Sequence, residues 1–182
     1  LEKCHESAKL TQYWIPKEGE YDLGSNGQPI KLTGAKVKAL KTNEGKLIAK
    51  VAPNTYTAFQ MEGSGLLQDG RLINLAEHKN AFMVLDRSKT PFGIGPHGQS
   101  LVPWISVAAN DIDIGTHLYI KQLDGVTLPN GLKHNGCVRV DDEGWSFNGC
   151  HIDFFVLQYK AFEELVDILP ETVSVVEKQC TL

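Results

Sequence analysis

Short apolar runs, each bounded by Gly, Asn, Asp or Pro, divide this chain along its whole length. Most of them alternate apolar and polar residues, which is the period of a strand with one buried face. The predicted strands span residues 11–15, 36–40, 47–52, 71–76, 82–86, 105–109, 117–123, 137–141 and 152–158. Many short strands with few helices predict a mainly β protein whose sheet closes, or nearly closes, into a barrel.

Two segments have helical character instead. Residues 159–169 place Phe162 and Leu165 on one face, and Pro170 ends this predicted helix. A weaker helix candidate covers residues 52–63. The sequence therefore predicts one or two short helices beside the strands.

Composition and charge limit the possible functions. No repeat or linker interrupts the 182 residues, so we expect one domain over residues 1–182. The net charge of −4 argues against nucleic acid, and the six lysines between residues 31 and 50 are expected to be solvated strand faces. No run approaches the ~18 apolar residues of a membrane helix, and residues 1–10 lack an apolar signal core. We therefore expect a monomer without membrane contact, from which any targeting segment has been removed.

The four cysteines form an even set without CxxC spacing, which is typical of disulfides in a secreted protein. Three pairings are possible. We expect Cys137–Cys150, which would close the loop between two predicted strands, and Cys4–Cys180, which would join the two ends of the chain. Each such bond typically contributes about 3 kcal/mol by restricting the unfolded chain.

Three further patterns match known sites only in part. GIGPHG at 93–98 matches GxGxxG, but Pro96 interrupts it and no helical pattern follows, so we expect a loop without a nucleotide. NDID at 110–113 lacks the alternating acids and the late Glu of a calcium loop. Two cysteines and their neighbouring histidines lack the spacing of a common zinc finger. Neither a metal nor a cofactor is expected.

The stretch 141–155, DDEGWSFNGCHIDFF, places Asp142 and Asp153 near the ends of predicted strands. On a strand, Asp153 points away from the side that Ile152 and Phe154 cover. Apolar neighbours raise the pKa of a carboxyl group until it can donate a proton near neutral pH, which glycoside cleavage requires. The residues alone leave two alternatives open, an exposed strand acid and a catalytic acid.

The same stretch resembles the signature of the three-aspartate (3D) domain and of membrane-bound lytic transglycosylase A, Asp-x-Gly-Gly-x-Ile-x-Gly-x-x-(Ile/Phe)-Asp. The matching positions are Asp142, Gly144, Gly149, Ile152 and Asp153. Residues 98–120 resemble a Ser-x-Ala and Gly-Thr segment of these families. TQYW at 11–14 and HIDF at 151–154 resemble segments of family 45 endoglucanases. The resemblance implies a six-stranded double-psi β-barrel with extra strands, a polysaccharide groove, and a relation to secreted fungal muramidases.

The resemblance also implies site residues. Asp153 would be the general acid and Asp142 its companion carboxylate, whereas Asp141 and Glu143 would face solvent. The implied substrate-binding residues are Tyr13, Trp14, Trp104, Ser106, Trp145 and His151. An aromatic ring suits the apolar face of a sugar, although Trp104 and Trp145 would serve equally well as core residues.

The chain departs from the family patterns at three places. Trp145 replaces the second glycine of the signature and Phe147 replaces its isoleucine. The first of the three aspartates has no clean match near Asn110. Ile15 stands where the family 45 enzymes carry their base. Acids that could replace this base follow at Glu18, Glu20 and Asp22.

These matches predict a secreted muramidase that hydrolyses the β-1,4 bond between N-acetylmuramic acid and N-acetylglucosamine in bacterial peptidoglycan. If Asp153 acts without a base, the sugar's own hydroxyl would attack, as in a lytic transglycosylase. A family 45-like β-1,4-glucanase is the other enzyme alternative. The non-enzyme alternative is an expansin-like or barwin-like wall-binding protein. The overall acidic charge predicts no attraction to anionic walls, so groove shape would carry recognition.

Overall fold

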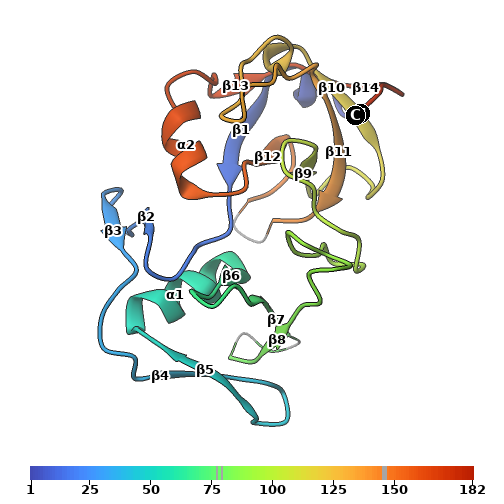
Figure 1. Cartoon of the computed structure of the whole chain (residues 1–182). Helices are drawn as coiled ribbons and strands as arrows, with labels where there is room; N and C mark the ends of the chain where they lie inside the picture. The colour runs from blue at the N-terminus through green and yellow to red at the C-terminus, as the bar shows by residue number, and fades with distance from the viewer. Residues whose placement is uncertain (77, 79, 145–146) are drawn as a thin grey trace. The chain divides into compact units, whose positions relative to one another are not determined.

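The computed structural model describes residues 1–76, 78, 80–144 and 147–182. The chain forms two compact units (Figure 1). The sheet unit comprises Leu1–Tyr13 and Ile94–Leu182, and the inserted unit comprises Trp14–Gly93. The expected single domain over residues 1–182 stays a prediction.

The sheet unit is built on one seven-stranded mixed sheet with the order β13-β1-β12-β9-β11-β10-β14. Its elements are η1 (Lys3–Ser7), β1 (Ala8–Tyr13), β9 (Ser106–Ala108), β10 (His117–Ile120), η2 (Lys121–Leu123), β11 (Cys137–Asp142), β12 (His151–Phe155), α2 (Tyr159–Leu165), β13 (Thr172–Val173) and β14 (Val175–Glu177). Strand β12 runs parallel to β1, and β11 runs parallel to β9. Two segments far apart in the sequence, β1 and β12, therefore lie side by side.

One face of this sheet is apolar. Leu10 pairs with Ile152, and Val107 pairs with both Phe154 and Val140. These five side chains are buried. Because side chains alternate between the two faces of a strand, the adjoining residues of β1, β9 and β12 point to the opposite face. That second face carries the polar residues.

The two edges of the sheet belong to one short segment. Strand β13 pairs with β1 at one edge, β14 pairs with β10 at the other, and Ser174 alone separates them. Consecutive Cα atoms are ~3.8 Å apart, so the sheet must curl until its edges approach each other. Among the described residues the seven strands nevertheless form an open order. The mainly β class is confirmed, whereas a closed six-stranded double-psi barrel is not.

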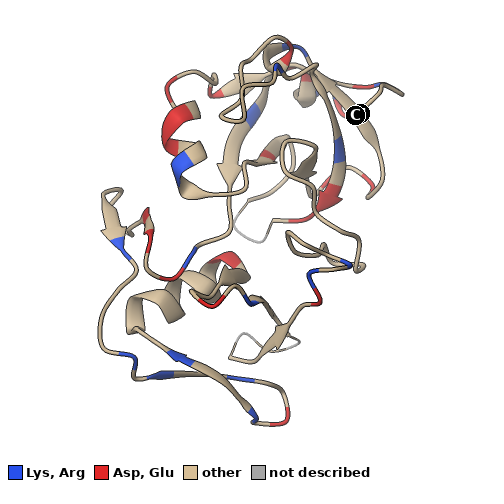
Figure 2. Cartoon of the chain, viewed as in Figure 1, with Lys and Arg blue, Asp and Glu red and all other residues tan. Residues whose placement is uncertain are grey.

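The inserted unit has its own small core. Its elements are β2 (Tyr21–Leu23), β3 (Pro29–Lys31), β4 (Lys38–Lys41), β5 (Leu47–Val51), α1 (Pro53–Glu62), β6 (Ser64–Leu66), β7 (Leu72–Leu75) and β8 (Phe82–Val84). Leu40 and Val51 of the β4–β5 hairpin pack with Phe59, Ile73 and Phe82. Figure 2 shows Lys and Arg residues along β4 and β5. No helix among the described residues is long and apolar enough to span a bilayer.

The predicted elements are found with shifted ends. The strand expected over 11–15 ends at Tyr13, and the run at 117–123 changes from strand to 3-10 helix after Ile120. Both predicted helices are present as α1 and α2. The strands that the pattern missed, β2, β3, β6, β13 and β14, have two or three residues each, which is too short for an alternation to be read.

The predicted disulfide pairing is wrong. The bonds are Cys4–Cys150 and Cys137–Cys180, rather than Cys137–Cys150 and Cys4–Cys180. The parallel pairing of β1 with β12 brings Cys150 to the start of β1, where the N–H of Lys9 donates to the carbonyl of Cys150. At the other end, Tyr119 pairs with both Cys137 and Val176, so β10 brings β11 beside the C-terminal segment. The two disulfides indicate an extracytoplasmic location, because such bonds persist in oxidising compartments.

Candidate active site

Asp142 and Asp153 stand in one row across the sheet. Strand β9 lies between them, and Ala108 pairs with Asp142 on one side and with Asp153 on the other. The register of β11 shifts between Val140 and Asp142, so Asp141 is the extra residue of a β-bulge. The bulge places Asp142, rather than Asp141, opposite Ala108. Both predicted carboxylates therefore flank the same strand.

Asp153 has the most perturbed carboxyl group of this row. Burial raises its pKa from 3.8 to about 7, and the negative charge of Asp142 raises it further. The Thr11 hydroxyl acts in the opposite direction, because it donates a 2.8 Å hydrogen bond to Oδ1 of Asp153 and stabilises the carboxylate. Thr11 is the direct pairing partner of Asp153 across β1 and β12. A substantial fraction of Asp153 is therefore protonated at neutral pH.

His151 extends this hydrogen-bonded group. Its Nε2 lies 2.6 Å from Oγ1 of Thr11. Thr11 has one hydroxyl hydrogen, which it donates to Asp153, so Nε2 of His151 must carry a hydrogen and donate to Thr11. Burial and then the charge of Lys9 lower the pKa of His151. The imidazole is neutral near pH 7, and it stacks on the Phe147 ring at 4.0 Å.

Asp142 has a different environment. Burial raises its pKa from 3.8 to about 6. The N–H of Glu143 donates to its Oδ1 at 2.8 Å and lowers the pKa, as does the Tyr13 hydroxyl, whereas the charges of Glu143 and Asp141 raise it. Asp142 thus loses its proton at a lower pH than Asp153 does.

Tyr13 lies near both acids. Its ring stacks on Phe155 at a centroid distance of 5.1 Å. The hydroxyl is buried and makes no hydrogen bond of normal geometry among the described residues, although it lies close enough to Asp142 to lower that pKa. Burial and the charges of Asp142 and Asp153 raise the pKa of Tyr13 well above its usual value. The phenol therefore stays protonated beside both carboxyl groups. Its predicted stacking on a sugar stays a prediction.

Asp141 is buried and paired, so the expectation that it faces solvent is wrong. Arg139 donates from Nε to Oδ1 at 2.7 Å and from Nη2 to Oδ2 at 3.0 Å. The buried Ser106 hydroxyl also donates to Oδ2, and it accepts a hydrogen bond from the N–H of Val102. Ser106, a predicted substrate-binding residue, is thus committed to the support of the bulge. Asp141 lies outside the family signature, which begins at Asp142, and its burial depends on Arg139, Ser106 and the bulge, which the resemblance does not reveal.

The three predicted tryptophans lie in different surroundings. Trp104 lies two residues before β9 and has a φ of 69°, and its ring packs against Phe154, which points to the apolar face of the sheet. Trp14 belongs to the inserted unit, where it is 7% exposed and donates from Nε1 to Asp22 at 2.7 Å. Trp145 lies outside the described residues. A role in sugar binding stays a prediction for each of them.

Two residues of the NDID turn support the loop before β12, and the sequence reading assigned them no role. Asn110 donates to the carbonyl groups of Gly144 and Phe147 and accepts from the N–H of Gly144 at 2.9 Å. Asp111 accepts from His5 at 2.8 Å and from the N–H of Cys150 at 3.1 Å. The sequence offered one weak signal for these contacts. NDID did not match a calcium loop, so its polar side chains had no ligand and could bind the neighbouring loop instead.

The acids proposed as substitutes for the missing base belong to the inserted unit. Oε1 of Glu18 accepts the N–H of Gln68 at 3.0 Å, and its Oε2 lies 3.8 Å from the Lys36 ammonium group. Asp22 accepts the indole N–H of Trp14, and burial raises its pKa. Both carboxylates are thus engaged by neighbours within their own unit.

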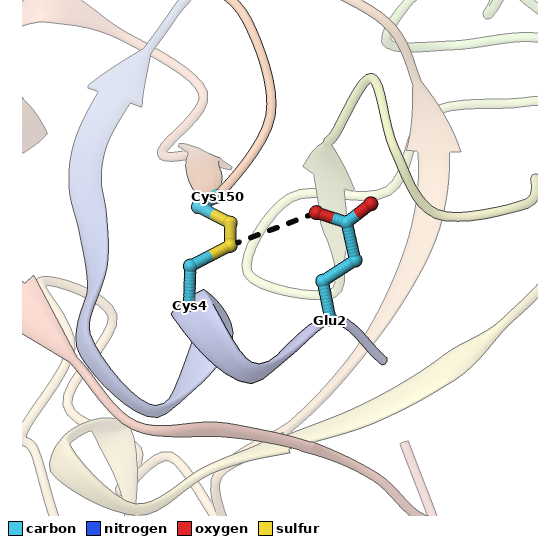
Figure 3. A group of neighbouring side chains, drawn as sticks. All are labelled: Glu2, Cys4 and Cys150. Carbon is cyan, nitrogen blue, oxygen red and sulfur yellow. Dashed lines mark hydrogen bonds between the residues drawn. A yellow bond between two sulfur atoms is a disulfide. The ribbon is translucent and has the colours of Figure 1, made fainter.

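Two groups of side chains have the composition of metal ligands. They are Glu2 with Cys4 and Cys150, and His5 with Asp111 and Cys150. Figure 3 shows that Cys150 is bonded to Cys4, so neither sulfur is a free thiolate.

The GIGPHG motif is a loop, as predicted, and a Cβ at Gly95 would lie 2.0 Å from the carbonyl oxygen of Asp141. Close packing against the backbone of Asp141 therefore explains why position 95 is a glycine.

The chain is similar in structure to several solved enzymes. A membrane-bound lytic murein transglycosylase from Agrobacterium tumefaciens matches with a TM-score of 0.59 and 11% identity, over 96% of this chain and 73% of that one. MltA from E. coli with bound chitohexaose matches with 0.57 and 16% identity, over 94% and 72%. MltA from Neisseria gonorrhoeae matches with 0.56 and 12% identity, over 96% and 74%. No protein-family model matches the sequence, and no curated protein matches it significantly. At these identities the likeness is one of fold, and the chain has the fold of the MltA-type lytic transglycosylases.

Proposed function

We propose that the chain cleaves the β-1,4 bond between N-acetylmuramic acid and N-acetylglucosamine in peptidoglycan, with Asp153 as the general acid. The observation that carries this proposal is the pKa of Asp153, raised to about 7 beside a second perturbed carboxyl group. A general acid works best when its pKa lies near the operating pH. The shared fold with enzymes named lytic transglycosylases, one of them with bound chitohexaose, supports a glycan substrate.

Thr11 orients the acid proton. Its hydroxyl hydrogen occupies Oδ1 of Asp153, so the transferable proton sits on Oδ2. When Oδ2 gives that proton to the glycosidic oxygen, the carboxylate that forms already accepts the hydrogen bond from Thr11. His151 holds the Thr11 hydroxyl in this direction by donating to it. The arrangement stabilises the charge that develops on Asp153 during bond cleavage.

Asp142 is the proposed base. Neighbouring strands are ~4.8 Å apart, so the Cα atoms of Asp142 and Asp153, which flank β9, are separated by about two strand spacings. Inverting glycosidases hold their carboxyl groups ~6.5–9.5 Å apart to admit a water molecule, and two side chains that incline towards each other over β9 would bring their carboxyl groups into that range. Above its pKa of about 6, Asp142 is ionised and can accept a proton from the attacking water. We therefore propose hydrolysis by a muramidase, and separately that this muramidase is secreted and monomeric.

Transglycosylation is the second candidate, and the shared fold favours it. In that reaction a hydroxyl of the sugar itself attacks, and the product carries an anhydro end instead of a reducing end. A single acid is sufficient for this outcome. Asp142 would then act only through its charge, which raises the pKa of Asp153.

Digestion of purified peptidoglycan, with cellulose as the control polymer, tests the proposal. Soluble fragments are analysed by mass spectrometry: reducing ends mean hydrolysis, and anhydro ends mean transglycosylation. Asp153→Asn should abolish release, whereas Asp167→Asn, an exposed acid of the same unit, should leave it unchanged. Release of glucose oligomers from cellulose alone would indicate a glucanase, and binding without release would indicate a wall-binding protein. Wild-type activity in Asp153→Asn would reject the assigned acid.

A further inference from the structure

The charges of the chain are divided unevenly between its two units. The sheet unit holds seven Lys and Arg residues against fourteen Asp and Glu residues, a net charge of −7. The inserted unit holds eleven against eight, a net charge of +3. The whole-chain value of −4 conceals this division. The inserted unit can therefore attract an anionic polymer, although the whole chain is acidic.

The positive charge of the inserted unit is concentrated on one hairpin. The hairpin lysines are Lys38, Lys41, Lys46 and Lys50, all of them exposed. Strands β4 and β5 pair Leu40 with Ala49 and Ala39 with Lys50. Leu40 points into the core, so Lys50 and Ala39 point outward, and Figure 2 shows blue segments along both strands.

These lysines have no anionic partner within the part of the chain that the structure describes. The ion pairs found in the inserted unit are Lys36 with Glu18 and Arg71 with Asp69. Lys38 lies 5.3 Å from the centroid of the Tyr56 ring, which is a cation–π contact and leaves its charge unneutralised. Residues 38–51 hold these four lysines and one acid, Glu44, so the hairpin has a net positive charge that attracts an external anion.

We propose that the hairpin lysines bind the carboxylate groups of the peptide chains of peptidoglycan. This inference rests on the proposed function, because it takes the anion to belong to the polymer that the sheet unit cleaves. Lysine side chains are mobile point charges, which suit carboxylates spaced irregularly along a flexible polymer. Residues 38–51 contain no aromatic side chain, which stacking on single-stranded nucleic acid would require. The hairpin would raise the local concentration of substrate and would offset the repulsion between the acidic sheet unit and an anionic wall.

Cosedimentation with insoluble peptidoglycan tests the inference. All proteins carry Asp153→Asn, so that the polymer is not digested. The variant Lys41→Gln/Lys46→Gln/Lys50→Gln leaves Lys38 against Tyr56 and removes three charges. Its matched control is Lys121→Gln/Lys133→Gln/Lys160→Gln, which removes three exposed lysines of the sheet unit. Thermal unfolding midpoints should be the same in both variants, because none of these side chains is buried.

The hairpin variant should bind at least about tenfold more weakly at low salt, and the control variant should bind like the parent. Raising the salt concentration should weaken the parent far more than the hairpin variant, since salt screens exposed charges. Amidation of the peptidoglycan carboxyl groups should reduce parental binding to the level of the hairpin variant.

Equal binding by the two variants would overturn the inference, as would unchanged binding to amidated peptidoglycan. Displacement by duplex DNA at equal charge concentration would also overturn it, because the hairpin would then be a general polyanion surface. The proposed cleavage is tested independently with the enzyme that carries Asp153. If this enzyme releases no muropeptides, the proposed activity is rejected. Lysine-dependent binding without release would support the docking surface and reject the activity.

Discussion

At the residue scale, Asp142 and Asp153 differ in the groups that oppose the effect of burial. Asp153 receives one hydroxyl hydrogen bond, from Thr11, whereas Asp142 receives a backbone N–H and lies near the Tyr13 hydroxyl. Their pKa values are about 7 and about 6. The two acids also interact through their charges, so the titration steps measured in solution belong to the pair. This order of pKa values supports the proposed roles, with Asp153 as the acid and Asp142 as the base.

The pH dependence of cleavage follows from these values. Asp153 must hold its proton, so activity should fall as the pH rises above about 7. Asp142 must be ionised if it is the base, so activity should also fall below about pH 6. In Asp142→Asn the acid limb should disappear, and the basic limb should move to lower pH because the charge that raises the pKa of Asp153 is removed. The rate of muropeptide release, measured across pH, should drop at least about tenfold in this variant.

Asp113→Asn serves as the control for that profile, because Asp113 is exposed and lies outside the row of Asp142 and Asp153. An unchanged or upward-shifted basic limb in Asp142→Asn would contradict the coupling between the two acids. Full activity in Asp142→Asn, with anhydro products, would assign the reaction to transglycosylation.

At the element scale, the position of β12 depends on what holds Cys150, the residue immediately before this strand. Cys150 has a φ of 59°, is bonded to Cys4 of η1, and accepts the N–H of Lys9. Asp111 accepts the N–H of Cys150 from the other side. The next residue is His151, which donates to Thr11 at the site. The disulfide therefore fixes the strand that carries Asp153.

The two disulfides should contribute different amounts to the free energy of unfolding. Their sequence separations are 146 residues for Cys4–Cys150 and 43 for Cys137–Cys180. Loop-closure entropy predicts roughly 5 and 4 kcal/mol respectively. Cys4→Ser/Cys150→Ser should therefore lose about 1 kcal/mol more stability in urea denaturation than Cys137→Ser/Cys180→Ser, and it should also lose more activity. A larger loss of both quantities in the second variant would contradict the role given to Cys150.

At the scale of the whole molecule, the acid pair makes the stability of the fold depend on pH. Both carboxyl groups have folded-state pKa values above their unfolded value of 3.8. The folded chain thus binds more protons than the unfolded chain between about pH 4 and pH 7, and stability must decrease as the pH rises through this interval. The net charge of −7 on the sheet unit adds like-charge repulsion in the same direction.

Neutralising the acid should recover this lost stability. Asp153→Asn should raise the free energy of unfolding at about pH 8 by up to roughly 4 kcal/mol, since each pKa unit corresponds to about 1.4 kcal/mol. The difference from wild type should shrink towards about pH 3, where Asp153 is largely protonated in both states. Urea denaturation at the two pH values measures it. A variant less stable than wild type at about pH 8 would show that burial of the charge is not costly here.

Local pattern missed β2, β3, β6, β13 and β14, but it was sufficient to predict nine of the strands, both helices, the GIGPHG loop, and the orientation of Asp153 away from Ile152 and Phe154. Each of these depends on residues within a few positions of one another, where strand alternation and turn chemistry act directly. The catalytic candidates Asp142 and Asp153 lie within one continuous stretch, but the resemblance to the family signature was needed to single them out.

Only the tertiary structure decided which distant residues meet. Thr11 reaches Asp153 across 142 positions, and the register of β1 against β12 places them together. Asp141, which was expected in solvent, is buried at the bulge, and the order of strands around β10 selected Cys180 as the partner of Cys137. The sequence by itself determined which side chains each strand offers to its two faces, because alternation is local. Which strands become neighbours, and in what register, depends on the packing of the whole chain, and that packing created the acid–hydroxyl–imidazole group at the candidate site.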